Sequence, residues 1–140
     1  MAVHVLSVLA YKEGDRVTST ALAGSVNTNP VIIRRLLLAL QRANLVETCK
    51  GARSGSRLKR SPSLINLAEV YRAVEFADSF PSPSRKPNTA CPVGHCIRET
   101  LERVFTSAHR AMERDLQKTT LASLLRAVKA SAACTQKRPS

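Results

Sequence analysis

The chain has 140 residues, 44% of them hydrophobic, which is enough apolar content for one folded domain with an extension and argues against global disorder. Lys and Arg number 22 against 10 Asp and Glu, and the formal net charge of +12 favours a polyanionic partner, nucleic acid first and an anionic membrane surface second. Aromatic residues make up only 4% and Trp is absent, which argues against proteins that bind single strands by base stacking.

The N-terminal segment predicts two helices. Residues 2–12 are apolar almost all round, a pattern typical of a buried helix. Thr18 or Ser19 can cap a second helix that runs through Ser25, because a side-chain oxygen there accepts from the free amides of the first helical turn.

The stretch VNTNPVIIRRLLLALQRANLV predicts a tight turn and a third helix. Asn29 caps this helix, Pro30 is its first residue, where a missing amide hydrogen costs nothing, and Asn44 ends it. Arg34 and Arg35 lie in its first two turns. Its inward face follows helical spacing and consists of Ile33, Leu36, Leu37 and Leu40.

Residues 45–60 change to the pattern of strands. Short strands at 45–49 and 57–60 are expected to flank a loop that holds Gly51 and Gly55, as in a β-hairpin. Between residues 34 and 60 there are eight Lys or Arg and one acidic residue, Glu47. More than half of the chain's positive charge surplus therefore lies on one helix and one hairpin.

A helix, a tight turn, a second helix and a basic hairpin in this order predict a winged helix–turn–helix. In that fold the second helix enters the DNA major groove, and the residues of its N-terminal turns reach base edges or phosphates. The expected DNA-binding residues are Thr28, Asn29, Val31, Arg34, Arg35, Lys50, Arg53, Arg57 and Lys59. The alternative interpretation is that these charges are solvated side chains of a helical domain that binds no DNA.

The C-terminal half predicts a linker and a long helix. Asn66 and Glu69 have the spacing of a capping box and open a helix that ends near Glu75. After the linker, a helix from about Ile97 to Gln117 carries a continuous apolar seam. The chain offers this seam too little of its own surface to pack against, so we expect a homodimer. The expected interface residues are Leu101, Val104, Phe105, Ala108 and Met112.

These elements give a mostly α fold with a small β-hairpin wing and a long C-terminal dimerisation helix. The expected divisions are a winged helix–turn–helix DNA-binding domain at 1–75, a linker and possible sensor loop at 76–96, dimerisation helices at 97–132 and a basic tail at 133–140. No apolar run approaches the roughly 20 residues of a membrane span and no signal peptide is recognised, so we expect a cytoplasmic protein.

Two of the four cysteines lie in the motif CPVGHC, where the linker meets the long helix. In a cytoplasmic chain, cysteines are expected as reduced thiols or ligands and not as a disulfide frame. Cys91 and Cys96 can be structural residues, a redox switch, or, with His95, part of a metal site. Adjacent residues such as His95 and Cys96 make poor ligands for one metal, so the metal site is the weakest of the three interpretations.

The order and spacing of these pieces resemble the Rrf-two family of bacterial winged-helix regulators, and the resemblance covers nearly the whole chain. It rests on AVHVLSVLA, ALAGSVNTNPVIIRRLLLALQRANLVET, KGARSGSRLKR, INLAEVYRAVE and CPVGHC before a long helix. The resemblance implies a homodimer that binds a palindromic operator, as a repressor in most members, and whose C-terminal helix crosses to the partner subunit.

Two features depart from the family pattern. The family's wing often has a run of glycines followed by Tyr, where this chain has Arg53, Ser54 and Ser56. The branch of the family that binds iron–sulfur clusters has three closely spaced cysteines, whereas here Cys134 lies far beyond Cys91 and Cys96. An iron–sulfur cluster normally needs four protein ligands, so this spacing disfavours one, and we expect no cofactor.

The sequence therefore predicts a sequence-specific DNA-binding regulator of transcription. The alternative is an RNA-associated or nucleoid-type protein that binds nucleic acid by charge alone, which would show no preference among sequences. An enzyme is not expected, because the chain has no Gly-rich phosphate loop after a strand, no paired carboxylates in an apolar setting and no nucleophile motif.

Overall fold

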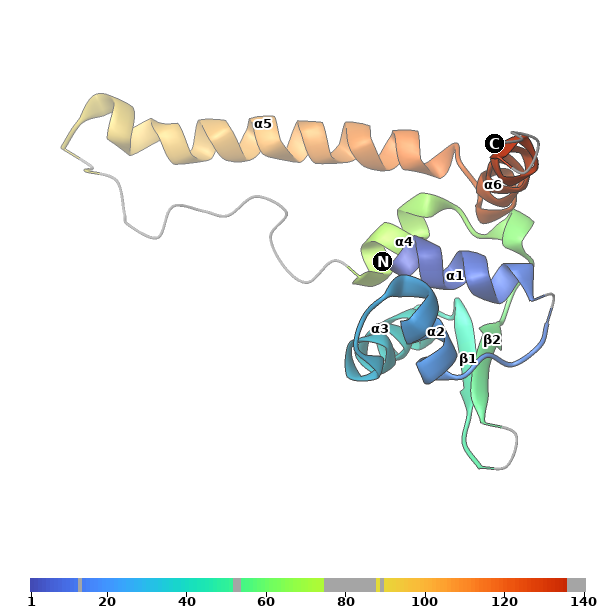
Figure 1. Ribbon diagram of the computed structural model, residues 1–140. Helices are drawn as coiled ribbons and strands as arrows, with labels where there is room; N and C mark the ends of the chain where they lie inside the picture. The colour runs from blue at the N-terminus through green and yellow to red at the C-terminus, as the bar shows by residue number, and fades with distance from the viewer. Residues whose placement is uncertain (13, 52–53, 75–87, 89, 136–140) are drawn as a thin grey trace.

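The computed structural model describes residues 1–12, 14–51, 54–74, 88 and 90–135. Figure 1 shows a body that contains the hairpin and the N-terminal helices, with a long helix at one side of it. The elements in chain order are α1 (Ala2–Tyr11), α2 (Ser19–Val26), α3 (Pro30–Arg42), β1 (Val46–Cys49), β2 (Gly55–Leu58), the short 3-10 helix η1 (Pro62–Leu64), α4 (Leu67–Val74), α5 (Pro92–Gln117) and α6 (Leu121–Thr135). The expected fold, mostly α with a hairpin wing, is confirmed.

The ends of α2 and α3 follow the expected chemistry. The hydroxyl of Thr18 accepts a hydrogen bond from the backbone N–H of Ala21 at 3.2 Å, and Asn29 Oδ1 accepts from the N–H of Val31 at 2.8 Å. Asn27 and Asn44 follow the two helices in the left-handed conformation, with φ of 56° and 57°. Asn tolerates this conformation better than most residues, so it ends a helix where Gly is absent.

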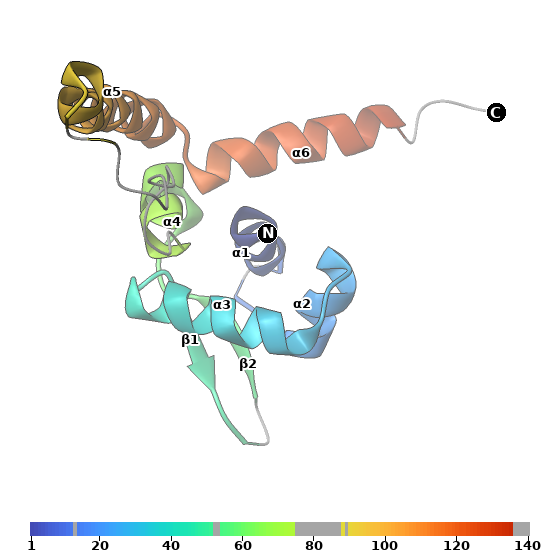
Figure 2. The same ribbon diagram turned by 90° about the vertical axis from the view of Figure 1, so that its left-hand side faces the viewer.

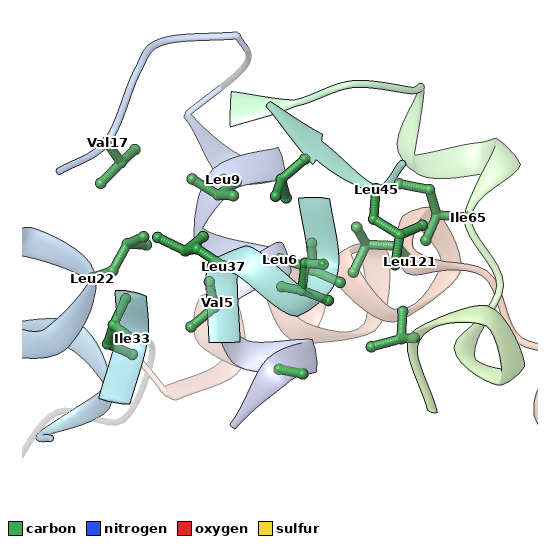
Figure 3. Close-up of a cluster of buried hydrophobic side chains, with 14 of the residues drawn as sticks. Val5, Leu6, Leu9, Val17, Leu22, Ile33, Leu37, Leu45, Ile65 and Leu121 are labelled. Carbon is green, nitrogen blue, oxygen red and sulfur yellow. The ribbon is translucent and has the colours of Figure 1, made fainter. Parts of the chain in front are cut away.

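The hydrophobic core gathers side chains from every layer of the body. Val5, Leu6 and Leu9 of α1 lie at its centre and are fully buried (Figure 3). α2 and α3 cover one side of α1, while Leu121, the first residue of α6, packs beside Ile65 on the other. Of the expected inward residues of α3, Ile33, Leu37 and Leu40 are buried and Leu36 is half-buried.

The hairpin is antiparallel, with Val46 opposite Leu58 and Glu47 opposite Arg57. Its second strand begins at Gly55, two residues before the predicted start. The hairpin is extended by a contact with the segment before α2, because Ser56 of β2 exchanges two backbone hydrogen bonds of 2.9 Å with Val17. Gly55 has φ of +145°, and a Cβ there would lie 3.0 Å from that of Arg16, so the position suits only glycine.

The long helix begins earlier than predicted. We had expected CPVGHC to be the end of a linker. Instead α5 starts at Pro92, so this motif forms the N-cap and the first turns of the helix. Gly94 permits this start, because a Cβ at residue 94 would lie 2.2 Å from the backbone oxygen of Asn88. α6 continues to Thr135, so the first three residues of the predicted tail are helical, while 136–140 and most of the predicted linker lie outside the described residues.

The base of α5 is joined to the body by backbone hydrogen bonds. The N–H of Leu67 donates to the carbonyl of Thr119 at 2.9 Å, and the N–H of Leu121 donates to that of Ile65 at 2.8 Å. From this base α5 extends past the body, and none of its residues is buried (Figures 1 and 2). Within the described part of the chain, no helix combines the length and the apolar character that a membrane crossing requires.

Candidate nucleic-acid interface

The outer face of α3 lies on the side of the body away from α5 and α6, and the hairpin projects beyond it (Figures 1 and 2). We call this outer face the recognition face. Because the apolar face of α3 is anchored in the core, the remaining positions point outward at helical spacing. The recognition face consists of Val31, Ile32, Arg34, Arg35, Leu38 and Arg42, all of them exposed.

The three arginines of the recognition face differ in their contacts. Arg34 Nε donates to the hydroxyl of Ser19, the first residue of α2, at 3.3 Å. Arg35 and Arg42 form no hydrogen bond or ion pair with any residue that the structure describes. They are seven residues apart, which places their Cα atoms on one side of the helix and about 10 Å apart along its axis. This is a suitable arrangement for binding an extended polyanion.

The residues before α3 have structural roles that limit what they can offer to DNA. The N–H of Thr28 is bonded to the carbonyl of Ala23 at 3.0 Å, and the residue is half-buried. The side-chain oxygen of Asn29 caps α3, which leaves its amide group at the surface. The N-terminus of α3, with its free amides and positive dipole end, lies beside them and favours an anion.

The basic residues of the hairpin fall into two groups. Arg57 is ion-paired with Glu47 on the opposite strand, and Arg16 lies 3.5 Å from the same carboxylate oxygen. The hydrogen bond from Arg57 is the main reason that the pKa of Glu47 lies below its ordinary value. Lys59 Nζ donates to Asn44 Oδ1 at 2.8 Å. Two of the expected DNA-binding residues, Arg57 and Lys59, are therefore engaged within the chain.

Lys50, near the tip of the hairpin, is exposed and makes no hydrogen bond or ion pair with the described residues. Arg53, which we also expected to contact DNA, lies outside the described residues. Lys50 is thus the described hairpin residue whose charge is most available to a phosphate.

Sequence reasoning missed the partners that hold the arginines, namely Ser19 for Arg34 and Glu47 for Arg57, and it missed that Arg16 shares Glu47. The pairing of Glu47 with Arg57 follows from the strand register, which the sequence did not predict. Ser19 and Arg16 come from a segment distant in the chain, and no local pattern signals their contacts.

The apolar seam expected on the long helix lies along α5 and is exposed within the single chain. Leu101 is 39% exposed, Val104 57%, Phe105 37% and Met112 39%, and Ala108 is exposed with them. An exposed seam of this length is unusual for a chain that acts alone, since such surface is normally covered by a partner.

Cys91 is the N-cap residue of α5. The nearby backbone N–H groups of Gly94 and Val93, in the first turn of the helix, lower the pKa of the Cys91 thiol below its ordinary value. Cys96 lies five residues further along, inside the helix. Residues at this spacing in a helix have Cα atoms about 8–9 Å apart, beyond disulfide reach, so a bond between the two cysteines would require the start of α5 to unwind.

His95 follows Cys91 by one turn, and its N–H donates to the carbonyl of Cys91 at 2.9 Å. All three residues of the proposed metal site, Cys91, His95 and Cys96, are exposed. Within the described ranges, no three His, Cys, Asp or Glu side chains lie close enough together to hold a metal ion.

Comparisons with known proteins agree with the fold. Residues 1–127 match the family model Rrf2, described as an iron-dependent transcriptional regulator. The chain is 38% identical over 125 residues to YwnA of Bacillus subtilis (strain 168), a proposed HTH-type transcriptional regulator, with 89% of this chain and 92% of YwnA covered.

Solved structures give the same result. The crystal structure of a proposed DNA-binding protein is 37% identical, with a TM-score of 0.70 over 89% of this chain and 95% of that one. A proposed transcriptional regulator from Lactobacillus plantarum is 27% identical, with a TM-score of 0.77 over 96% and 91%. The chain therefore belongs to the Rrf2 family of transcriptional regulators, and it is a regulator and not an enzyme.

Proposed function

We propose that this regulator binds a palindromic DNA operator as a homodimer and represses transcription by occluding a promoter. The observation that carries the proposal is the recognition face of α3, where Arg35 and Arg42 are exposed and make no ion pair with the described residues. An α-helix fits the major groove, and arginine there can bind guanine through two hydrogen bonds.

In the proposed complex α3 lies in the major groove. Its N-terminal turns carry Val31, Arg34 and Arg35, which would be next to the base edges, while Thr28 and Asn29 would approach a phosphate at the helix N-terminus. Lys50 and Arg53 would follow the neighbouring backbone. Arg57 and Lys59 would contribute less, because each must first leave its partner within the chain.

The exposed seam of α5 supports the homodimer. Two copies of the seam can cover each other about a two-fold axis, since the same patch then meets itself. The two-fold axis would present two recognition faces to DNA in opposite orientations, which is the symmetry of a palindrome. As a DNA-binding regulator, the protein would act in the cytoplasm.

Cys91 and Cys96 remain a proposed redox pair. Oxidation by a peroxide would join the two thiols as a disulfide, with loss of two electrons and two protons, and hydrogen peroxide would be reduced to two waters. The bond would unwind the start of α5, and the change in that helix would reach the DNA-binding body. We propose no iron-dependent step, because the described donor groups do not converge on a common point.

The test is selection of bound fragments from a genomic library with the purified full chain, followed by sequencing. We expect a recurring palindrome whose affinity exceeds that of random DNA by at least about a thousandfold. Equal affinity for every sequence, falling with salt in the same way on all of them, would instead identify a binder that acts by charge alone.

A further inference from the structure

Two neighbouring contacts join α4 to α5. Arg72 and Glu113 form a bidentate ion pair, with 2.6 Å between Arg72 Nε and Glu113 Oε1 and 3.1 Å between the second nitrogen and oxygen. One residue earlier on α4, the ring of Tyr71 lies 5.6 Å from that of His109, which is one helical turn from Glu113. We call these four residues the α4–α5 latch.

The latch contacts α5 within about two turns of the point where the helix joins the body. The base of α5 is held by the backbone hydrogen bonds at Thr119 and Leu121, which act as a pivot. Glu113 is only 19% exposed and Arg72 is 49% exposed, so the ion pair is partly shielded from water. From His109 to Pro92, no residue of α5 is buried. The tilt of α5 about its base therefore depends on the latch.

We propose that the α4–α5 latch determines the distance and rotation between the two DNA-binding bodies of the dimer, and so the half-site spacing that the protein accepts. This inference rests on the proposed function, because spacing has a meaning only for a dimer on DNA. Its residues are positioning residues that are remote from the recognition face.

The geometry makes spacing sensitive to the latch. From Glu113 to Pro92 the helix rises about 30 Å, so a tilt of about 10° at the latch moves its far end by about 5 Å. Adding one base pair between half-sites changes their separation by only about 3.4 Å and their rotation by about 34°. A tilt of this size thus displaces the far end of α5 by as much as one or two added base pairs displace a half-site.

The ion pair of the latch constrains the orientation of the helices more than it stabilises the fold. A bidentate pair between Arg and a carboxylate favours one relative orientation of the two side chains, which a single hydrogen bond does not. Because the pair is partly exposed, its contribution to overall stability is expected to be small. The latch can therefore set the tilt of α5 relative to the body without being essential for folding. Its loss is expected to broaden the distribution of tilt angles and to leave the fold intact.

The first experiment measures the angle without DNA. Spin labels are placed at Gln41→Cys on α3 and Thr106→Cys on α5, in a full-length chain whose native cysteines are replaced by Ser, and the labelled chain is diluted with unlabelled chain. We expect one narrow distance distribution for the parent, a broad one for Arg72→Ala, and a narrow one again when Arg72→Glu is combined with Glu113→Arg. An unchanged narrow distribution for Arg72→Ala would overturn the proposal.

The second experiment measures spacing on the selected operator with one or two base pairs inserted or deleted between half-sites. We expect the wild type to lose at least about tenfold in affinity for each change, and Arg72→Ala to lose clearly less. The matched control is Arg103→Ala, because Arg103 bonds to Glu99 at 2.8 Å within α5 and its side chain is 76% exposed. The control should keep the wild-type spacing preference.

The outcomes separate the two proposals. If the wild type shows no sequence preference, the proposed function fails, while the spin-label result still decides whether the latch fixes the angle. If the wild type binds a palindrome and Arg72→Ala discriminates between spacings as sharply as the wild type, the latch proposal fails and the proposed function stands.

Discussion

Helices α3 and α5 are both amphipathic, yet they leave opposite kinds of surface exposed. α3 buries its apolar face in the core, carries three Arg and no acidic residue, and leaves Arg35 and Arg42 without an ion pair among the described residues. α5 carries four Arg and four acidic residues, forms ion pairs such as Arg98–Glu102 and Arg103–Glu99 within the helix, and leaves its apolar seam exposed.

The difference in exposed surface indicates which partner each helix can bind. A helix whose apolar side is already covered and whose charge is uncompensated favours a polyanion. A helix whose charges balance and whose apolar side is exposed favours a second apolar surface. The two interfaces of the proposed dimer on DNA are thus separated in space and in chemistry, and each can be disrupted without the other.

The largest expected effect is on the α5 seam. Phe105→Glu should dissociate the dimer, because a charge left unpaired in a covered apolar interface costs about 3–5 kcal/mol. Sedimentation at micromolar protein concentration measures the oligomeric state. Thr106→Glu, at the adjacent exposed position, is the control and should leave the dimer intact. A wild-type chain that sediments as a monomer would show that the seam has another partner.

The second effect concerns base reading by the arginines of α3. Arg35→Ala should cost about 1–3 kcal/mol on the operator and flatten the preference at one base position, provided that Arg35 reads a guanine. Arg34→Ala should cost less, because Arg34 is already bonded to Ser19. Titration of operator and random DNA with each variant measures this, with Arg103→Ala on α5 as the control. Equal losses of affinity on both DNAs would make Arg35 a phosphate contact.

The third effect concerns the hairpin, where the chain itself competes with DNA for arginine. Lys50→Ala should reduce the magnitude of the slope of log affinity against log salt by about one unit. Arg57→Ala should change this magnitude less, because Glu47 already neutralises Arg57. Glu47→Gln should release Arg57 and increase the magnitude of the slope. DNA binding measured at several salt concentrations tests this order of effects. A larger change in slope for Arg57→Ala than for Lys50→Ala would refute it.

The smallest effect is a pH dependence at the latch. The hydrogen bond from Arg72 holds the pKa of Glu113 below its ordinary value of 4.5, so the ion pair stabilises the fold fully above pH 4.5 and its contribution is lost as the pH falls through the lowered pKa. The denaturant midpoint of the wild type should exceed that of Glu113→Gln at pH 7, and the difference should shrink below pH 4.5. A constant difference would mean that the carboxylate's charge is unimportant.

Much of the fold could be predicted from the sequence because its signals are local. The caps at Thr18, Asn29 and Asn66 are made by side chains that bond to amides two or three residues away, as at Asn66, whose Oδ1 accepts from the N–H of Glu69 at 3.0 Å. The burial of Ile33 and Leu37 likewise follows from helical spacing alone. The three elements of the winged helix–turn–helix, and the clustering of charge on them, were visible for this reason.

The tertiary structure decided which residues of the candidate site are available. The sequence could not show that Arg57 and Lys59 are engaged by Glu47 and Asn44 while Arg35 is not, because ion pairs depend on strand register and on segments distant in the chain. It also placed the start of α5 too late, because Pro92 was interpreted as part of the linker, whereas it is the first residue of the helix.

The class of the protein follows from the order and spacing of its residues, which set the helices, their apolar faces and the net charge. The orientation of these parts depends on tertiary contacts. These contacts place the recognition face opposite α5, and they join α4 to α5 through Arg72 and Glu113, which are 41 residues apart. Contacts over such separations form only when the core has brought the helices together, so residue spacing along the chain carries no signal of them.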